Sequence, residues 1–345
     1  MVSTLAQYAV IDLHLHLDGS LSPAWMLEWA EKQQIELPAH TPEALLPYVS
    51  APQDCSDLNE YLRCFDLPLS LLQTPEALSA AVADVLQRLD QQGLIYAEIR
   101  FAPQLHTGLA MSQEDAVQAA LTGLQNGLAN TQLFKANLIL CCMRAADNKA
   151  ENLETIRLAK KYLAKAEAGV VAIDLAGAEG LFPTNNFAEE FHYASEISVP
   201  FTIHAGEAAG AESVQQALAL GASRIGYGIR SIESESVMAQ LVRQETPLEM
   251  CPCSNLQTKA AQSLKDYPLR RFLTRGIVAT LNTDNMTVSQ TSLQQEYRLL
   301  AQEYQLSRAE AKQLMLNSIA AAFLPAEEKM ALLNTIQQRY PQLFE

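Results

Sequence analysis

Lysine and arginine are scarce in this chain, and they form no basic cluster in the sequence. The 345 residues include 24 lysines and arginines against 39 aspartates and glutamates, which gives a formal net charge of -15 at pH 7. Nucleic acids and anionic membrane surfaces attract basic patches, so this balance argues against both as partners. No apolar run reaches the roughly 20 residues that a membrane span requires. We therefore expect a protein that binds neither nucleic acid nor membrane.

Cysteine is also scarce. Six cysteines in 345 residues are too few for a dense disulfide framework. Cys251 and Cys253 flank a proline, but no second pair has matching spacing, so we interpret them as small buried residues and not as a metal clip. Met1–Leu5 lacks the basic segment and apolar core that begin a signal peptide. We expect a cytoplasmic protein.

Short apolar runs alternate with amphipathic stretches along most of the chain. The predicted strands are Val10–Leu17, Leu94–Ala102, Ala136–Met143, Val170–Ala176, Pro200–Ala205, Arg224–Tyr227, Pro247–Cys251 and Ile277–Asn282. The predicted helices are Pro75–Gln91, Glu114–Leu128, Glu151–Lys165, Phe187–Glu196 and Ser213–Leu220. Because such alternation produces a parallel sheet with right-handed crossovers, we predict an α/β fold, a closed (β/α)8 TIM barrel.

Two helical regions lie outside this alternation. Ser22–Leu72 carries a helical pattern without a clear strand, which predicts an insertion after the first strand that is able to cover the barrel mouth. The stretch Ser307–Gln342 predicts a helical C-terminal tail. No repeat, low-complexity tract or Gly/Ser linker divides the chain, so residues 1–345 are expected to form a single domain.

Histidines and a carboxylate stand at the ends of three predicted strands. His14 and His16 face the same side of their strand because side chains alternate along it. On their own they could be two half-buried core histidines, but His204 and Asp284 also end apolar runs. The working residues of a barrel lie at the C-terminal ends of its strands, so the four side chains should meet there. Three imidazoles and one carboxylate suit Zn²⁺, with iron, manganese or cobalt as alternatives.

Five motifs in order resemble the adenosine deaminase family of metal-dependent aminohydrolases. They are His-x-His-x-Asp-Gly from His14, Asp-Leu-Ala-Gly from Asp174, His-Ala-Gly-Glu from His204, Arg-Ile-Gly-Tyr-Gly from Arg224 and Asn-Thr-Asp from Asn282. The His-x-Glu and Pro-Cys-x-x-Cys signature of the other zinc deaminases is not matched. The resemblance implies hydrolysis of the 6-amino group of adenosine or 2′-deoxyadenosine, which gives inosine and ammonia.

The resemblance also implies a metal site and an acid. His14, His16, His204 and Asp284 would hold one divalent ion, most simply Zn²⁺. Asp284 would also take part in catalysis, and His16 would face the substrate. Glu207 would protonate purine N1 and so make C6 electrophilic, for which its carboxyl must be protonated in the complex.

Four further positions would contact the substrate or the attacking water. The Gly177 N–H would meet purine N3, and Asp18 would accept a ribose hydroxyl, which favours a nucleoside over a free base. Asn285 stands where the family commonly has a second aspartate, and its amide can donate to purine N7. Tyr227 stands where the family has a histidine that orients the water. With a reference pKa near 10, a tyrosine is a poor base at pH 7, which predicts slower turnover.

Three functions remain open on the sequence alone. The first is an adenosine and 2′-deoxyadenosine deaminase that is slowed by Tyr227. The second is a deaminase of another 6-aminopurine, such as adenine or a modified adenosine. The third is a homologue that binds a metal and a nucleoside without turnover, although retention of Glu207 and all four ligands disfavours it. The oligomeric state cannot be deduced from the sequence.

Overall fold

The computed structural model describes residues 5–52, 54–164 and 167–345. Residues 1–4, on which the expectation about a signal peptide largely rests, lie outside these ranges. So does Lys165, the predicted end of one helix.

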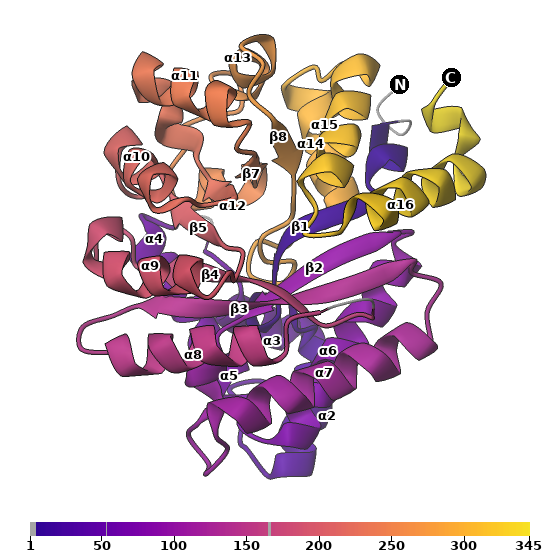
Figure 1. Ribbon diagram of the computed structural model, residues 1–345. Helices are drawn as coiled ribbons and strands as arrows, with labels where there is room; N and C mark the ends of the chain where they lie inside the picture. Colours follow the sequence, from indigo (N-terminus) through magenta and orange to yellow (C-terminus); the bar gives the residue numbers. More distant parts are fainter. Residues whose placement is uncertain (1–4, 53, 165–166) are drawn as a thin grey trace.

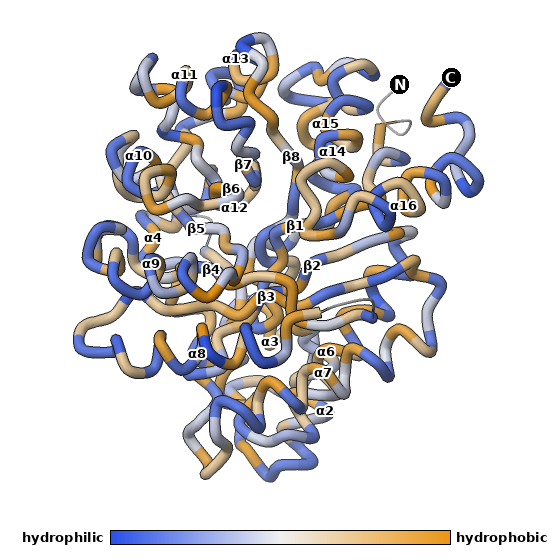
Figure 2. The backbone as a smooth tube through the Cα atoms, viewed as in Figure 1, coloured by the Kyte–Doolittle hydropathy of each residue, from blue (hydrophilic) through white to orange (hydrophobic). Residues whose placement is uncertain are grey.

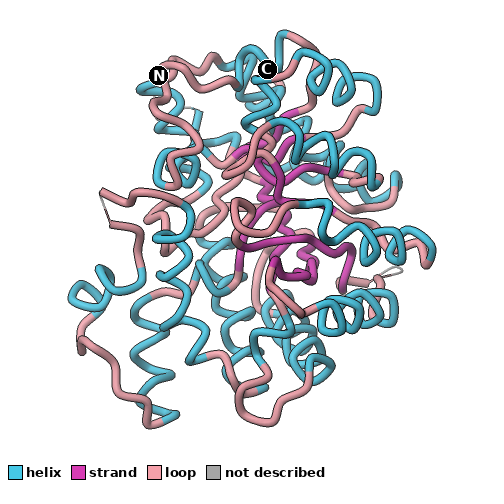
Figure 3. Tube along the Cα trace, turned by 90° about the vertical axis from the view of Figure 1, so that its left-hand side faces the viewer, coloured by secondary structure: helices cyan, strands magenta, loops and turns pink. Residues whose placement is uncertain are grey.

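Parallel strands form the centre of the molecule, and helices surround them (Figures 1 and 3). The strands are β1 (Ile11–His16), β2 (Tyr96–Phe101), β3 (Lys135–Arg144), β4 (Val170–Gly177), β5 (Thr202–Ala205), β6 (Arg224–Tyr227), β7 (Leu248–Met250) and β8 (Ala279–Leu281). They pair in chain order as two four-stranded sheets, β1 to β4 and β5 to β8. Single bridges from Ile173 to Phe201 and from Leu15 to Asp284 join the two sheets on both sides. The strands therefore close into the predicted (β/α)8 barrel.

The helices on the outside of the barrel follow the expected alternation. They are α6 (Pro75–Gln91), α7 (Gln113–Ala129), α8 (Lys149–Lys161), α9 (Ala188–Glu196), α10 (Ala211–Leu220), α11 (Glu235–Gln244), α12 (Pro252–Gln257), α13 (Leu269–Thr274), α14 (Leu293–Glu303), α15 (Arg308–Ala321) and α16 (Ala326–Arg339). Polar and apolar residues alternate along α8 and α10 in Figure 2, as expected for helices with one buried face. Among the described residues, no helix is long and apolar enough to cross a membrane.

Local sequence signals explain why the boundaries of α6 were predictable. Thr74 precedes the helix and its hydroxyl accepts a hydrogen bond from the Ala77 N–H, while Pro75 occupies the first turn. Gly93 follows the helix with a φ of 82°, a left-handed conformation that glycine adopts without strain. The helices α11 to α14 were not predicted. α12 and α13 have only 6 residues each, which leaves little periodicity, whereas α11 and α14 carry buried apolar residues at helical spacing that the prediction missed.

The region between β1 and α6 is helical, and it contributes a wall of the main pocket. It contains α2 (Pro23–Gln33), α3 (Pro42–Val49), α4 (Leu58–Leu62) and α5 (Asp66–Leu71). We call residues 51–71 the cap. Leu58, Leu62 and Phe65 of the cap line the pocket at the C-terminal ends of the strands. The placement agrees with the predicted role of the insertion at the barrel mouth.

Candidate metal centre and active site

Four predicted ligands converge on one point at the C-terminal ends of β1, β5 and β8. His14, His16, His204 and Asp284 each offer a ligand atom, and these atoms all lie within 4.8 Å of one another. Oδ1 of Asp284 lies 3.3 Å from Nε2 of His14 and 3.4 Å from Nε2 of His16. Among the described residues, His14 Nε2 and Asp284 Oδ1 are buried without a hydrogen-bond partner. Buried polar atoms are rarely left unpaired, so this arrangement fits a divalent cation between them.

Two buried carboxylates orient the histidines. The ring N–H at Nδ1 of His14 donates to Oε2 of Glu249 at 2.7 Å, and Nδ1 of His204 donates to Oδ2 of Asp174 at 2.8 Å. Each bond turns the Nε2 atom of its ring toward the common point and selects the tautomer whose Nε2 lone pair is free. Sequence reasoning missed this role of Asp174 and Glu249. The available signal was a carboxylate inside an otherwise apolar buried strand.

Arginines balance these carboxylates inside the barrel. Arg100 donates to Asp174 and to Glu249, each at 2.9 Å, and Arg224 donates to Glu249 at 2.6 Å. All four side chains are buried. Burial raises the pKa of the Glu249 carboxyl, but the charges of Arg100 and Arg224 outweigh it and hold that pKa well below its usual value. Glu249 is therefore an ionised carboxylate that accepts the hydrogen bond from the His14 N–H.

The electrostatics of the cluster favour neutral His16 and His204 beside an ionised Asp284. Burial lowers the pKa of His16 well below its usual value, and burial also lowers the pKa of His204. Burial lowers the pKa of His14 as well, but the neighbouring Asp284 and Glu249 carboxylates overcome this and raise it. Burial raises the pKa of Asp284, but the nearby imidazoles of His14 and His16 overcome this and hold it below the usual range. Neutral histidines and a carboxylate are the protonation states that bind a metal ion.

Glu207 stands beside this cluster with a free acidic oxygen. Its side chain is buried, and among the described residues Oε1 has no hydrogen-bond partner. Burial raises the pKa of Glu207 well above its usual value, and the charges of Asp284 and Glu179 raise it further. These shifts favour the protonated carboxyl, which is the form that the predicted role requires.

Glu179 holds the loop that carries Glu207, a role that the sequence did not reveal. Its Oε2 accepts from the backbone N–H groups of Glu207, Ala208 and Ala209 at 3.0, 2.7 and 3.0 Å. Its Oε1 accepts from the Gly206 N–H at 2.7 Å and from a serine hydroxyl. A single carboxylate thus satisfies four successive N–H groups of the loop after β5. This acceptor fixes where the backbone of Glu207 lies.

The hydroxyl of Tyr227 is hydrogen-bonded to Asp284, one of the candidate metal ligands. Its hydroxyl donates to Oδ2 of Asp284 at 2.9 Å, and its ring lies 5.0 Å from that of His14. Burial raises the pKa of Tyr227 well above its usual value, and the charges of Asp284 and Glu207 act in the same direction. The side chain is therefore a neutral phenol. It cannot act as a base near pH 7.

Two of the site residues have a left-handed backbone conformation. Asp284 and Tyr227 have φ angles of 65° and 59°, values that residues with a side chain seldom adopt. Gly177, at the end of β4, has a φ of 105°. Such outliers gather at functional sites, where the surrounding structure enforces them.

A cavity of about 260 Å³ connects the predicted site residues. Apolar side chains of the cap and of β2 and β3 form part of its lining. The predicted site residues that line it are His16, Asp18, Gly177, His204, Glu207, Tyr227, Asp284 and Asn285. His14 is fully buried and contacts the site through its neighbours. Cys251 and Cys253 are not part of the metal cluster, although Cys251 is fully buried, as expected for a small core residue.

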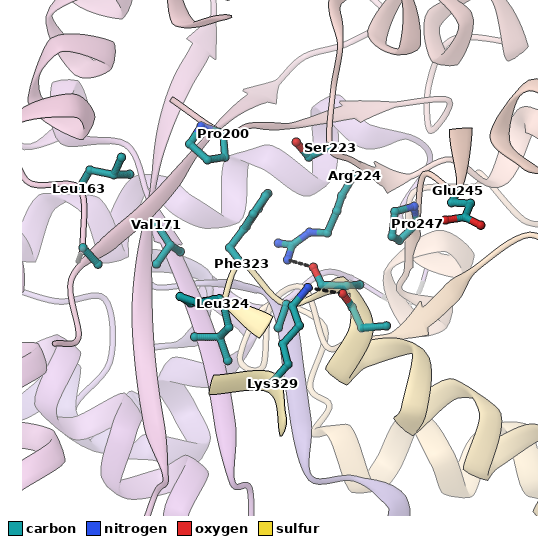
Figure 4. A pocket seen from close by; sticks show the side chains of 15 residues that line it. Leu163, Val171, Pro200, Ser223, Arg224, Glu245, Pro247, Phe323, Leu324 and Lys329 are labelled. Carbon is teal, nitrogen blue, oxygen red and sulfur yellow. Dashed lines mark hydrogen bonds between the residues drawn. The ribbon is translucent and has the colours of Figure 1, made fainter. Parts of the chain in front are cut away.

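A larger cavity of about 530 Å³ lies at the opposite end of the barrel (Figure 4). Arg224 at the start of β6 and Lys329 of α16 reach into it, and both donate to backbone carbonyls, those of Ala321 and Ala320. None of the predicted site residues lines this cavity. In barrels of this kind the N-terminal face serves stability and the C-terminal face carries chemistry, so the smaller cavity is the candidate active site.

The fold and the ligand set together define a class. A parallel (β/α)8 barrel that gathers three histidines and an aspartate at its C-terminal face is a metal-dependent hydrolase of the amidohydrolase type.

Comparison with known proteins narrows this class to one family. The sequence profile described as Adenosine deaminase matches residues 10–339. A protein named adenosine deaminase from Haemophilus ducreyi is 77% identical over 343 residues, which cover 99% of this chain and 100% of that one. The chain belongs to the adenosine deaminase family.

Solved structures have the same fold. An adenine deaminase from Arthrobacter aurescens superposes with a TM-score of 0.85 at 28% identity and covers 95% of this chain and 98% of its own. An amidohydrolase from Burkhoderia ambifaria, solved with bound zinc, superposes with a TM-score of 0.83 at 20% identity, covering 98% of this chain and 92% of its own. At 20% identity, the similarity to the Burkholderia ambifaria protein shows only that the two chains share a fold.

Proposed function

We propose that this protein is an adenosine and 2′-deoxyadenosine deaminase. The reaction adds one water across C6 of the purine and releases ammonia, so adenosine and water give inosine and ammonia. The observation that carries the proposal is the pairing of Glu207 with the four-ligand cluster in one cavity. A protonated buried carboxyl and a set of unpaired ligand atoms are the two parts that such a hydrolysis needs.

We propose one Zn²⁺ per chain, held by His14, His16, His204 and Asp284. Three imidazole nitrogens and one carboxylate match the donor preference of zinc better than that of magnesium or calcium, which prefer oxygen. When bound, such an ion supplies a nucleophilic water at neutral pH.

Glu207 would donate its proton to purine N1. Protonation there draws electrons from C6 and makes that carbon more susceptible to attack by water. Its unpaired Oε1 and its raised pKa both support this role. The loop bound by Glu179 would hold the carboxyl at a fixed distance from the metal ligands.

Three residues would hold the nucleoside. The Gly177 N–H would donate to purine N3, where the φ of 105° makes glycine the fitting residue. Asn285 would donate from Nδ2 to purine N7. Asp18, which lies in the same cavity, would accept a ribose hydroxyl.

The charges around the cavity favour a nucleoside over a nucleotide. Arg144 is the one arginine or lysine that lines the described cavity, and its Nη atoms already donate to Phe182 O, Thr184 Oγ1 and His204 O. Asp18 and Asp66 also line the cavity and would repel a phosphate. We therefore propose a neutral sugar as the substituent at N9.

Ultraviolet absorbance of purified, zinc-supplied protein tests the function. Adenosine and 2′-deoxyadenosine should be converted, and adenine and adenosine monophosphate should be converted much more slowly. A metal-replete Glu207→Gln sample serves as the matched negative control. Conversion of adenine alone, or binding of adenosine without turnover, would contradict the proposal.

We also propose a cytoplasmic location. All six cysteines are free in the described structure, and buried free thiols suit a reducing compartment. The partner we propose is the small-molecule substrate, with no nucleic acid and no membrane, because the chain is strongly acidic.

A further inference from the structure

Tyr61 lies where the cap meets the segment after β8. It belongs to α4 and is 2% exposed, within a small apolar cluster separate from the main core. The members of this cluster, which we call the cap cluster, are Ala51, Cys55, Leu58, Tyr61, Cys64 and Val288. A backbone hydrogen bond of 2.8 Å from the Ala51 N–H to the Val288 carbonyl joins the cap to the same segment.

The Tyr61 hydroxyl forms a directed chain of hydrogen bonds. Nδ2 of Asn285 donates to Oη of Tyr61 at 3.0 Å, and Oη lies 2.7 Å from Oγ of Ser289. An amide N–H can only donate, so Oη accepts from Asn285. Either hydroxyl can donate in the bond between Tyr61 and Ser289, so the Tyr61 proton can go to Ser289.

The other side of the Asn285 amide lies against Gly19. A Cβ placed on Gly19 would come within 1.8 Å of Oδ1 of Asn285, so no other residue fits at this position without a shift. Among the described residues, this Oδ1 has no hydrogen-bond partner. The hydrogen bond with Tyr61 is therefore the side-chain contact that distinguishes the two ends of the amide.

The orientation of this amide decides how it meets a purine. Nδ2 carries two N–H groups, of which one points to Tyr61 and the other is free to donate to a ligand in the cavity. A flipped amide would present Oδ1 to purine N7, and two acceptors in contact repel each other. We propose that Tyr61 is a positioning residue that fixes the Asn285 amide for donation to purine N7, so that docking of the cap sets recognition of the base. The inference rests on the proposed function, because it assumes a purine in this cavity.

A ligand pair that differs only at position 7 isolates this contact. Inosine has N7, whereas 7-deazainosine has C–H there, and neither is deaminated. Dissociation constants of both are measured by calorimetry with zinc-loaded protein, for the unchanged chain and for Tyr61→Phe. The unchanged chain should prefer inosine by about 10-fold, as expected for one hydrogen bond, and Tyr61→Phe should reduce this preference to about 2-fold or less. Binding of 7-deazainosine should stay the same.

Tyr8→Phe is the matched control. Tyr8 is a buried tyrosine near the N-terminus, and its hydroxyl accepts from Arg308 at 3.0 Å, away from the cavity. This variant should keep the full preference for inosine. If Tyr61→Phe does not fold, Ser289→Ala removes the second hydrogen-bond partner of the Tyr61 hydroxyl and should also reduce the preference.

The outcomes separate this inference from the proposed function. An unchanged chain that deaminates adenosine, while Tyr61→Phe keeps the full inosine preference, overturns the role of Tyr61 alone. Equal weakening of both ligands in Tyr61→Phe also overturns it, because it shows a purely structural effect. An unchanged chain with no preference between the ligands overturns the N7 contact and this inference with it. Failure of the unchanged chain to deaminate adenosine counts against the proposed function.

Discussion

The hydroxyl of Tyr227 donates a 2.9 Å hydrogen bond to Oδ2 of Asp284. A proposed metal ligand is therefore bonded to the residue that replaces the histidine of the family motif. Since the donated proton is already used, the phenol has only its oxygen lone pairs left to offer an attacking water.

We predict that Tyr227→His increases kcat for adenosine by about 10²-fold, because an imidazole with a reference pKa near 6.5 can exchange a proton near neutral pH. Steady-state kinetics with adenosine, 2′-deoxyadenosine and adenine measure this at full metal loading. Tyr227→Phe is the control, since it removes the bond to Asp284 without adding a base. Equal or lower turnover of the histidine variant would mean that the pocket has adapted to tyrosine.

Asp284→Ala should abolish tight metal binding. It removes one of the four converging ligands, and loss of even an orienting partner of a ligand costs about 10- to 100-fold in affinity. Elemental analysis of chelator-free protein should give about one divalent ion in the unchanged chain and almost none in the variant, and His14→Ala should behave alike. Asp66→Ala, at an exposed carboxylate of the same cavity, should retain the ion. No stoichiometric metal in the unchanged chain would contradict the site.

Glu207→Gln should reduce kcat by at least about 10²-fold and leave metal content unchanged, because an amide of nearly equal volume cannot deliver the proton. The active form of Glu207 is the protonated one, and its pKa is raised by burial and by the charges of Asp284 and Glu179. Activity should therefore persist through neutral pH and fall as the pH rises past that pKa. Wild-type turnover in a metal-replete variant would remove Glu207 from the mechanism.

Glu179→Gln tests whether the loop after β5 is held by a charge. A glutamine keeps only one acceptor oxygen, so it cannot accept all four backbone N–H bonds that Glu179 accepts through its two carboxylate oxygens, and kcat should fall by about 10- to 100-fold through misplacement of Glu207. Loss of the negative charge should also lower the pKa of Glu207 and move the alkaline limb of the pH profile to lower pH. Glu190→Gln, at a buried carboxyl of α9, should show neither effect.

Asp18→Ala should raise KM for nucleosides more than it lowers kcat. Asp18 would contact the sugar, which is remote from the reacting carbon, so its loss removes binding that is equal in the ground and transition states. Kinetics with adenosine and with adenine make the comparison. An equal change for both compounds would show that Asp18 does not act through the ribose.

The sequence predicted the barrel because its pattern is local. The bounds of β6 and α6 agree with the structure, since caps, proline and buried apolar positions lie within the element itself. The convergence of the four candidate ligands was also predictable, because strand ends of a barrel meet at one face. Hydrogen bonds between residues that are far apart in the sequence were not predictable. Nothing near Glu179 in the sequence indicates that it binds the loop 28 residues later, and Tyr61 and Asn285 are 224 residues apart.

Closure of the barrel by β1 and Asp284 has a consequence for how the protein is made. The Asp284 N–H donates to the His14 carbonyl, and the His16 N–H donates to the Asp284 carbonyl. Asp284 therefore completes both the proposed ligand set that includes His14 and His16 and the pairing that closes the barrel. The ribosome releases the chain from its N-terminus, and His14 is synthesised long before Asp284. The proposed metal site is therefore complete only after Asp284 has been synthesised, so an ion that needs all four ligands would bind late in biosynthesis.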